Sequence, residues 1–448
     1  ATSSSSQRKL AKSIETENVY SVYESAGSVF ETSQRENDPW EQEQVLELRT
    51  ETSIARTPSI GYNNFRDFTA WERVNTSGLH EILVKRTTFT DTIDQFYENE
   101  EFYSLPSVSY GGTIGLNLSK NINAKQLAVV VWRSNESLKF YLRCDGRNTQ
   151  ILDGSVPGTD NDASNPSVIV ENYKNTGNED TNFYFHVTFE SRGMIYYGYA
   201  RYDIDNNSVD WSYISPVFEE YQEIQNPAKP IVVLHPPIVN GKAGNEYPSS
   251  LPHIFWQAHV TDNTCKTSFG CGDFIFYRTL VDVQLWEWSA IDEFTHSDGG
   301  DFHQEFSPTA AILTIGENNY LRSLWQCNDH LAYSEKLLPN GNWSNVHSLE
   351  TALQDNAKSP HIVSRGESFY AVWTQGTEVP YHIRSYDFTI PKRQSKIFST
   401  TDKDSLENQC YPRRGSVDFS KIKLHDRKNK MSGTFWMTVN PFIHNING

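Results

Sequence analysis

A short motif built around proline recurs along the chain, and each copy is followed by an apolar segment that ends in an aromatic residue. Self-similarity at such a spacing is typical of repeat architectures, in which one small unit of secondary structure is used several times. The prolines of the motif are Pro58, Pro106, Pro166, Pro230, Pro308 and Pro360, with a weaker seventh at Pro412. The repeat therefore limits the fold more than any single local pattern does.

The aromatic residues keep the same order as the prolines. The apolar segments end at Trp71, Trp132, Phe189, Trp256, Trp325, Trp373 and Trp436, and after each comes a polar turn and a further apolar segment. The intervals between prolines run from 48 residues (Pro58 to Pro106) to 78 residues (Pro230 to Pro308). This is enough chain for a four-stranded antiparallel sheet with loops of varying length. Seven units predict an all-β, seven-bladed β-propeller, with a six- or eight-bladed ring as the alternative.

Ring closure in a propeller requires the last sheet to pair with the first. The last repeat ends soon after its third apolar segment, so we expect its outermost strand to come from residues 44–50, whose apolar positions alternate. This divides the chain into an N-terminal arm at residues 1–38 and a single propeller domain at 39–448. The arm is expected to lie over the surface or, alternatively, to pair with another molecule and form a homo-oligomer.

Charge and hydropathy exclude several classes of partner. The chain has 56 acidic and 39 basic side chains and a net charge of -17, which repels nucleic-acid backbones. Its longest apolar runs have the length of strands and fall short of the ~20 residues that span a bilayer. No glycine-rich phosphate loop and no Gly-x-Ser-x-Gly nucleophile motif is found in the sequence, which excludes nucleotide and α/β-hydrolase chemistry. We therefore expect no nucleic-acid binding and no transmembrane segment.

The cysteines and glycosylation sequons bear on the compartment. The segment from Cys265 to Cys271 has the small residues of a hairpin tip that a disulfide could close. A secreted or cell-surface location is the expectation, because five sequons are compatible with a glycoprotein. They lie at Asn75, Asn117, Asn135, Asn206 and Asn342.

The repeat alone predicts which residues lie on the ligand-binding face. The loops between blades and the loops between the second and third strands of a blade emerge on one face of a propeller, and here they precede each proline and follow each aromatic residue. Arginine, glutamine and asparagine offer donors suited to sugar hydroxyls and carboxylates. The candidates are Arg73, Arg133, Gln257, His259, Gln326, Asn328, Asp329, His330, Gln375, Lys358 and Arg413. For any one of them, the alternative is that it only caps a strand end or bonds to loop backbone.

The repeat, for example residues 359–373 ending in Tyr370-Ala371-Val372-Trp373, resembles that of the sialidase-like, BNR-repeat β-propeller superfamily. The resemblance covers nearly the whole chain from about residue 40. The family's Asp-box, Ser-x-Asp-x-Gly-x-x-Trp, is only echoed: Ser334 to Trp343 is two residues too long and has no Asp in place. Asp205 leads to Trp211 without the glycine. The resemblance thus implies a propeller whose catalytic motifs are degraded.

Two functions remain open. The first is a non-catalytic, lectin-like module that binds glycans or proteins through its loop face, as a subunit of a larger assembly. The second is a sialidase-like glycoside hydrolase, which needs three arginines, a Tyr-Glu pair and an Asp, and for which Tyr411 and Arg413 are candidates. No cofactor is expected. Calcium is the alternative, at 203–207 or 160–162, where oxygen ligands cluster, although such tracts are often simple turns.

Overall fold

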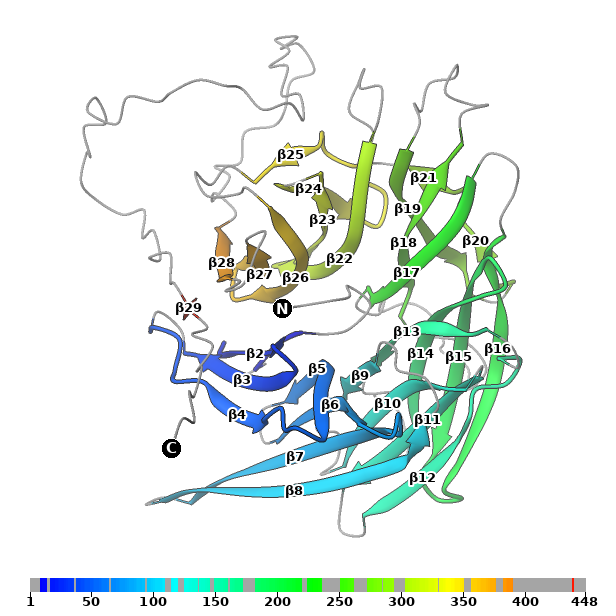
Figure 1. The fold of residues 1–448 in the computed structure, drawn as a ribbon. Coiled ribbons are helices and arrows are strands. Elements are labelled where there is room, and N and C mark those ends of the chain that lie inside the picture. Colours follow the sequence, from blue (N-terminus) through cyan, green and yellow to red (C-terminus); the bar gives the residue numbers. More distant parts are fainter. Residues whose placement is uncertain are drawn as a thin grey trace, which may run out of the picture.

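A computed structural model shows seven small antiparallel sheets arranged in a ring, a seven-bladed β-propeller (Figure 1). The described residues contain strands, turns and loops and no helix. The structure describes residues 9–389 and 437–438, apart from 14–16, 36–37, 64–65, 93–94, 109–113, 120–124, 136, 146–148, 160–161, 172–181, 220–223, 236–249, 262–271, 284, 294–302, 329, 350–355 and 376–381. The predicted fold class is thereby confirmed.

The strands follow the chain around the ring, and we number the blades I to VII in chain order. Blades I to IV contain β1 (Leu10–Lys12), β2 (Val19–Ser25), β3 (Ser28–Gln34) and β4 (Gln44–Glu47); β5 (Ser53–Asn63), β6 (Arg66–Asn75), β7 (His80–Thr92) and β8 (Gln95–Val108); β9 (Ile114–Leu118), β10 (Gln126–Ser134), β11 (Ser137–Asp145) and β12 (Gln150–Ser155); and β13 (Ser164–Val170), β14 (Asn182–Ser191), β15 (Met194–Asp203) and β16 (Ser208–Glu219).

Blades V to VII complete the ring. They contain β17 (Ile224–Leu234), β18 (Pro252–Val260), β19 (Gly272–Asp282), β20 (Glu287–Trp288) and β21 (Asp292–Glu293); β22 (His303–Ile315), β23 (Asn318–Cys327), β24 (His330–Leu338) and β25 (His347–Ser348); and β26 (Ala357–Arg365), β27 (Ser368–Gln375), β28 (His382–Thr389) and β29 (Met437–Thr438). A short parallel ladder between β19 and β22 joins blades V and VI into one continuous sheet.

A β-bulge explains why prolines and aromatic residues recur together in the sequence. In five blades the residue before the proline has a positive φ, and the proline and this residue together lie opposite one aromatic of the second strand. In blade II, for example, Arg56 pairs with Glu72 and Ser59 with Ala70, which leaves Thr57 and Pro58 opposite Trp71. The residues with positive φ are Thr57 (51°), Asn165 (48°), Lys229 (52°), Ser307 (56°) and Ser359 (48°). A bulge removes the ladder bond that proline cannot donate, which is why proline recurs there.

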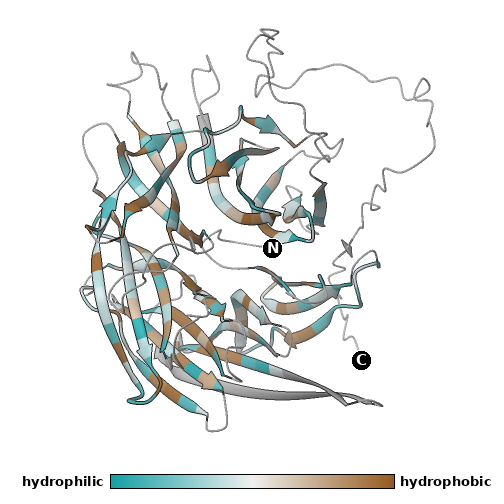
Figure 2. Ribbon diagram, turned by 180° about the vertical axis from the view of Figure 1, so that it is seen from behind, coloured by the Kyte–Doolittle hydropathy of each residue, from teal (hydrophilic) through white to brown (hydrophobic). Residues whose placement is uncertain are grey.

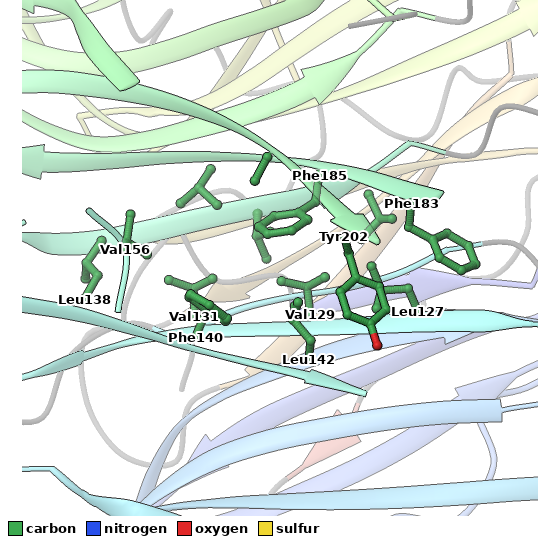
Figure 3. Packing of buried hydrophobic residues seen from close by; sticks show 14 of the residues in the cluster. Leu127, Val129, Val131, Leu138, Phe140, Leu142, Val156, Phe183, Phe185 and Tyr202 are labelled. Carbon is green, nitrogen blue, oxygen red and sulfur yellow. The ribbon is translucent and has the colours of Figure 1, made fainter. Parts of the chain in front are cut away.

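The aromatic residues at the bulges belong to the packing between blades. Trp71, Trp256 and Trp325 are buried to 1% exposure or less, and Phe189 is fully buried. The apolar residues of neighbouring blades interdigitate; Figure 3 shows Leu127, Val129 and Val131 of β10 against residues of blade IV such as Phe185. Hydrophobic segments lie within the strands of the blades (Figure 2), and β10 is buried along almost its whole length, as expected for a sheet packed on both faces.

The N-terminal residues form a blade of their own, which differs from the predicted arm at residues 1–38 and from the boundary at residue 39. β1, β2 and β3 pair in sequence, and β4 pairs with β3. Tyr23, 1% exposed, stands in β2 where the other blades carry their aromatic residue. The prediction that residues 44–50 form the outermost strand of the last blade is wrong, because that place is taken by β29, which pairs with β28.

The number of blades is right, although two of the predicted units differ. Pro106 lies in β8, the last strand of blade II, and not in the first strand of blade III, which begins at Ile114. The seventh predicted unit, from Pro412 to Trp436, lies outside the described residues. Blade I supplies the seventh sheet instead.

The seam between blades VII and I closes the ring without a shared strand in the described part of the chain. Leu10, Val19 and Trp40 of blade I pack against Tyr370 and Val372 of blade VII. Arg365, at the end of β26, donates from Nε to the Glu17 carbonyl oxygen (3.1 Å) and from Nη1 to Gln34 Oε1 (3.2 Å). Its Nη2 donates to the carbonyl oxygen at residue 35 (3.2 Å). An apolar core and one buried guanidinium therefore hold the first and last blades together.

A second repeated contact joins blades within the ring. The residue after the aromatic accepts a hydrogen bond from the bulge N–H of the next blade. Glu24 accepts from Thr57 (3.1 Å), Glu190 from Lys229 (2.5 Å) and Gln257 from Ser307 (3.0 Å). The bulge that admits proline leaves this N–H out of the ladder, and the neighbouring blade satisfies it.

Glu190 allows a test of this contact, because burial raises the pKa of its carboxyl group despite the opposing bonds from Lys229 and Asn165. A carboxyl whose folded pKa is raised contributes stability below its unfolded pKa of about 4.3, and that contribution is lost as pH rises through the folded pKa.

We expect Glu190→Ala to lower the free energy of unfolding by about 2 kcal/mol, since it leaves the buried backbone N–H of Lys229 without its acceptor. Glu190→Gln keeps an acceptor without the charge, so it should match or exceed the wild type at pH 7 and lose that advantage at pH 4. Urea denaturation at the two pH values measures both, and an alanine variant as stable as the wild type would contradict the role of this contact.

Candidate functional site

The face predicted from the repeat exists in the structure. The first strand of a blade begins, and the second strand ends, at the same edge of the sheet, as Ser53 and Asn75 show by pairing with each other. The residues after the aromatics and before the prolines therefore gather on one side of the ring. Their side chains differ in whether they are available to a ligand.

A groove on this face lies at the seam of blades I and II. It has a volume of about 810 Å³, within the range of about 300–1,000 Å³ that is usual for ligand sites. Its walls come from β4 and the following connection, from the start of β5 and from the β6–β7 hairpin. The lining residues are Val45, Leu46, Glu47, Leu48, Thr50, Thr52, Ser53, Arg73, Asn75, Thr76, Ser77 and Glu81.

Arg73 is the charged centre of the groove and one of the predicted ligand residues. Its Nε donates to Glu47 Oε1, and its Nη1 lies 3.7 Å from Glu81 Oε2. The other oxygen of Glu47 accepts the indole N–H of Trp71, the buried aromatic of blade II. The repeat thus positions the site: the buried indole fixes Glu47, Glu47 orients Arg73, and the Arg73 side chain remains 38% exposed.

Hydroxyl and amide groups surround this ion cluster. Thr50 Oγ1 lies 2.9 Å from Ser53 Oγ and 3.2 Å from Thr52 Oγ1, and either atom of each pair can donate. Asn75 Oδ1 accepts from Ser77 N (3.1 Å) and Oγ (2.6 Å), which orders the hairpin tip in the manner of an Asx turn. The groove therefore combines polar donors and acceptors on ordered backbone.

Two apolar side chains form the exposed part of its wall. Val45 is 51% exposed and Leu48 is 59% exposed, and both line the groove together with the hydroxyl-bearing residues. Large apolar side chains exposed at a concave polar site gain free energy when a ligand covers them. A ligand with hydroxyl groups on its edges and C–H groups on its faces fits this arrangement.

Three of the other predicted residues use their amide groups within the protein. Gln257 Oε1 accepts from the bulge N–H of Ser307, as described above. Gln326 Nε2 donates to the carbonyl oxygen of Asn328 (2.9 Å), itself a turn residue with φ 52°. Gln375 Oε1 accepts from Arg384 Nε (2.8 Å). Of these three, Gln326 bonds to loop backbone, whereas Gln257 bonds to the bulge of the next blade and Gln375 to a side chain of the adjacent strand β28.

The remaining candidates lie on separate blades. Arg133 donates to the Asn135 carbonyl oxygen (2.9 Å) and lies 3.5 Å from Asp162. His259 lies 3.2 Å from Asp273 in blade V. His330 begins β24 opposite Cys327, and Lys358 is exposed on β26 opposite Thr374. Asp329 and Arg413 lie outside the described residues, and among the described candidates Arg73 alone lines the groove.

Two of the other described arginines bond to groups of the propeller itself. Arg278 donates to the carbonyl oxygens of Val217 and Ser289, and Arg322 pairs with Glu335 at 2.6 Å. Val217 lies in β16 of the neighbouring blade IV, and Glu335 lies in β24, directly opposite Arg322 in β23. Tyr411, the candidate nucleophile, lies outside the described residues.

The sequence also predicts a disulfide and five glycosylation sites. Cys265 and Cys271, predicted to form a disulfide, lie outside the described residues. The sequons at Asn135, Asn206 and Asn342 are exposed and Asn75 is half-buried. Glycosylation at Asn117 is wrong, because the side chain is 7% exposed and its Oδ1 accepts from Val170 N (2.9 Å) in the next blade.

The candidate calcium loop at residues 203–207 forms a turn. Asp203 Oδ1 accepts from the backbone N–H groups of Asp205 (3.0 Å) and Asn206 (3.1 Å). Bonds from Asn206, first from its side chain and then from its backbone, lower the pKa of Asp203. Within the described ranges, no three His, Cys, Asp or Glu side chains are grouped as metal ligands. The same part of the chain contains no helix long and apolar enough to cross a membrane.

Comparison with known proteins gives similarity of structure at very low identity. No family model matches the chain, and no curated protein matches it. An endosialidase of phage phi92 is 10% identical, with a TM-score of 0.45, over 95% of this chain and 74% of the other. A Trypanosoma rangeli sialidase is 8% identical, with a TM-score of 0.41, over 86% of this chain and 53% of the other. An Aleuria aurantia lectin in complex with α-methyl-L-fucoside is 10% identical, with a TM-score of 0.37, over 78% of this chain and 96% of the other.

Proposed function

We propose that this protein is a non-catalytic β-propeller that binds glycans through the groove between blades I and II. The observation that carries the proposal is the composition of the groove, in which an exposed guanidinium held by two carboxylates lies among hydroxyl groups and exposed aliphatic side chains. Sugar hydroxyls both donate and accept, so they can bond to the threonine and serine hydroxyls and to the carboxylates at once. Val45 and Leu48 would cover the C–H face of a sugar ring.

A binding role is favoured over hydrolysis by the ion pairs of Arg73, since a sialidase needs guanidinium groups that grip the substrate carboxylate and both Glu47 and Glu81 already engage this one. A secreted or cell-surface protein that takes part in a larger assembly is the setting we propose for such a module. Its partner there would be a glycan-bearing molecule. No cofactor is part of the proposal.

We expect Arg73→Ala to lower the affinity for glycans at least tenfold, because it removes the donor group and releases Glu47 and Glu81 to repel each other. Thr52→Trp, which fills the groove without changing its charge, should have a similar effect. Arg133→Ala is the matched control, since Arg133 lies next to an aromatic on the same face but outside the groove. A glycan array followed by calorimetry measures the affinities, with circular dichroism as a check on folding.

Two results would count against the proposal. One is an Arg133→Ala variant that loses binding while Arg73→Ala and Thr52→Trp keep it. The other is turnover of fluorogenic sialosides or other glycosides by the wild-type protein, which would favour the hydrolase.

A further inference from the structure

The charges in the groove bear on the kind of glycan it accepts. Of the lining residues, Arg73 carries a positive charge and Glu47 and Glu81 carry negative charges, and the others are uncharged. One positive and two negative charges give the groove a formal charge of -1. This local excess has the same sign as the charge of the whole chain, -17.

The positive charge is also engaged already. Glu47 is the nearer partner of Arg73, with a side chain only 11% exposed, and it is held in place by the indole of Trp71. Glu81 lies directly opposite Arg73 in the β6–β7 ladder and is 31% exposed. A sugar carboxylate that entered would have to displace one of these groups or bind Arg73 in the presence of both.

From this geometry we infer that the groove binds neutral glycans in preference to those that carry a carboxylate, sialylated glycans included. The inference rests on the proposed function and adds the class of ligand. Glu81 is the residue we assign to charge selection, because it is the more exposed of the two carboxylates and its ion pair with Arg73 is the longer one. Glu47 is held by two bonds and positions Arg73.

The test compares matched pairs of glycans, each as the neutral oligosaccharide and as the same oligosaccharide capped with sialic acid. The full chain is produced in bacteria, so that no glycan attached to Asn75 occupies the groove. For the wild type, we expect the neutral member of a pair to bind about tenfold more tightly, which corresponds to about 1.4 kcal/mol. The ratio should fall at high ionic strength, because salt screens charges at an open site.

Glu81→Gln removes the selecting charge and should reduce the ratio from about tenfold to about twofold. Glu287→Gln, at an exposed glutamate on blade V, is the matched control and should keep the wild-type ratio. Tighter or equal binding of the sialylated members by the wild type would overturn the inference and leave glycan binding itself intact. A folded wild-type protein that retains no glycan of either kind would instead overturn the proposed function.

Discussion

Replacing Tyr23 by alanine is expected to lower the free energy of unfolding of the whole domain by about 3 kcal/mol, and Trp256→Ala by about 3–5 kcal/mol. Both side chains are buried to 1% exposure or less at the equivalent place in their blades. Trp256 packs with its ring centroid 5.3 Å from that of Phe218 and 6.0 Å from that of Phe276. Tyr23 packs within the core between blades I and VII. Each truncation leaves a cavity between two blades that backbone movement cannot fill.

Chemical denaturation followed by intrinsic fluorescence and by circular dichroism gives the two free energies. Tyr23→Phe keeps the ring and removes only the hydroxyl group, so it should stay within about 1 kcal/mol of the wild type. Trp256→Phe should likewise lose less than Trp256→Ala. If Tyr23→Ala left the stability of the ring unchanged, residues 10–47 would be an appendage and not a blade.

Arg365→Ala is expected to lower the free energy of unfolding by about 3–5 kcal/mol, because it removes three hydrogen bonds from a charged donor and leaves their acceptors without it. Its guanidinium also lies 5.0 Å from the centre of the Tyr370 ring, and that cation–π contact is lost with it. The side chain joins the last blade to the first, so the loss should appear as early opening of this seam. Hydrogen exchange should speed up in β1, β2 and β26 before it does in blades III and IV.

The neighbouring turn offers a control for this prediction. Glu367 is exposed two residues from Arg365, and Glu367→Ala should leave stability within about 0.5 kcal/mol of the wild type. Arg365→Lys keeps the charge, but an ammonium cannot reach three separated acceptors, so we expect an intermediate loss. An Arg365→Ala variant as stable as Glu367→Ala would show that the apolar residues alone close the ring.

The bulges explain why the sequence was informative about the fold. Proline is favoured where a ladder bond is missing, and a bulky aromatic is favoured opposite the two residues of the bulge. Because both requirements come from one local structure, Pro230 and Trp256 could be matched across a long separation in sequence. Blade I escaped prediction because β1 is only three residues long and Tyr23 replaces the tryptophan. Without a proline, its aromatic residue alone was too weak a signal.

The candidate site was predicted only in part for a related reason. Arg73 follows Trp71, so the repeat placed it on the ligand face. Glu47 and the hydroxyls of the connection after β4 were missed, because residues 44–50 were predicted to be the outermost strand of the last blade and not of blade I. Glu81 lies across the hairpin from Arg73 and pairs with it in the ladder, which the turn around Gly78 could have indicated. The groove is a property of two adjacent blades, and no pattern within one repeat describes it.

Hydrogen exchange measured by mass spectrometry, with and without a neutral glycan that the protein retains, tests the location of the site most directly. Bound ligand should slow exchange in residues 45–53 and 73–81, which line the groove from two blades, and leave residues 357–365 of blade VII unchanged. Protection confined to the loops around Gln257 or Lys358, with none at the seam of blades I and II, would contradict the account.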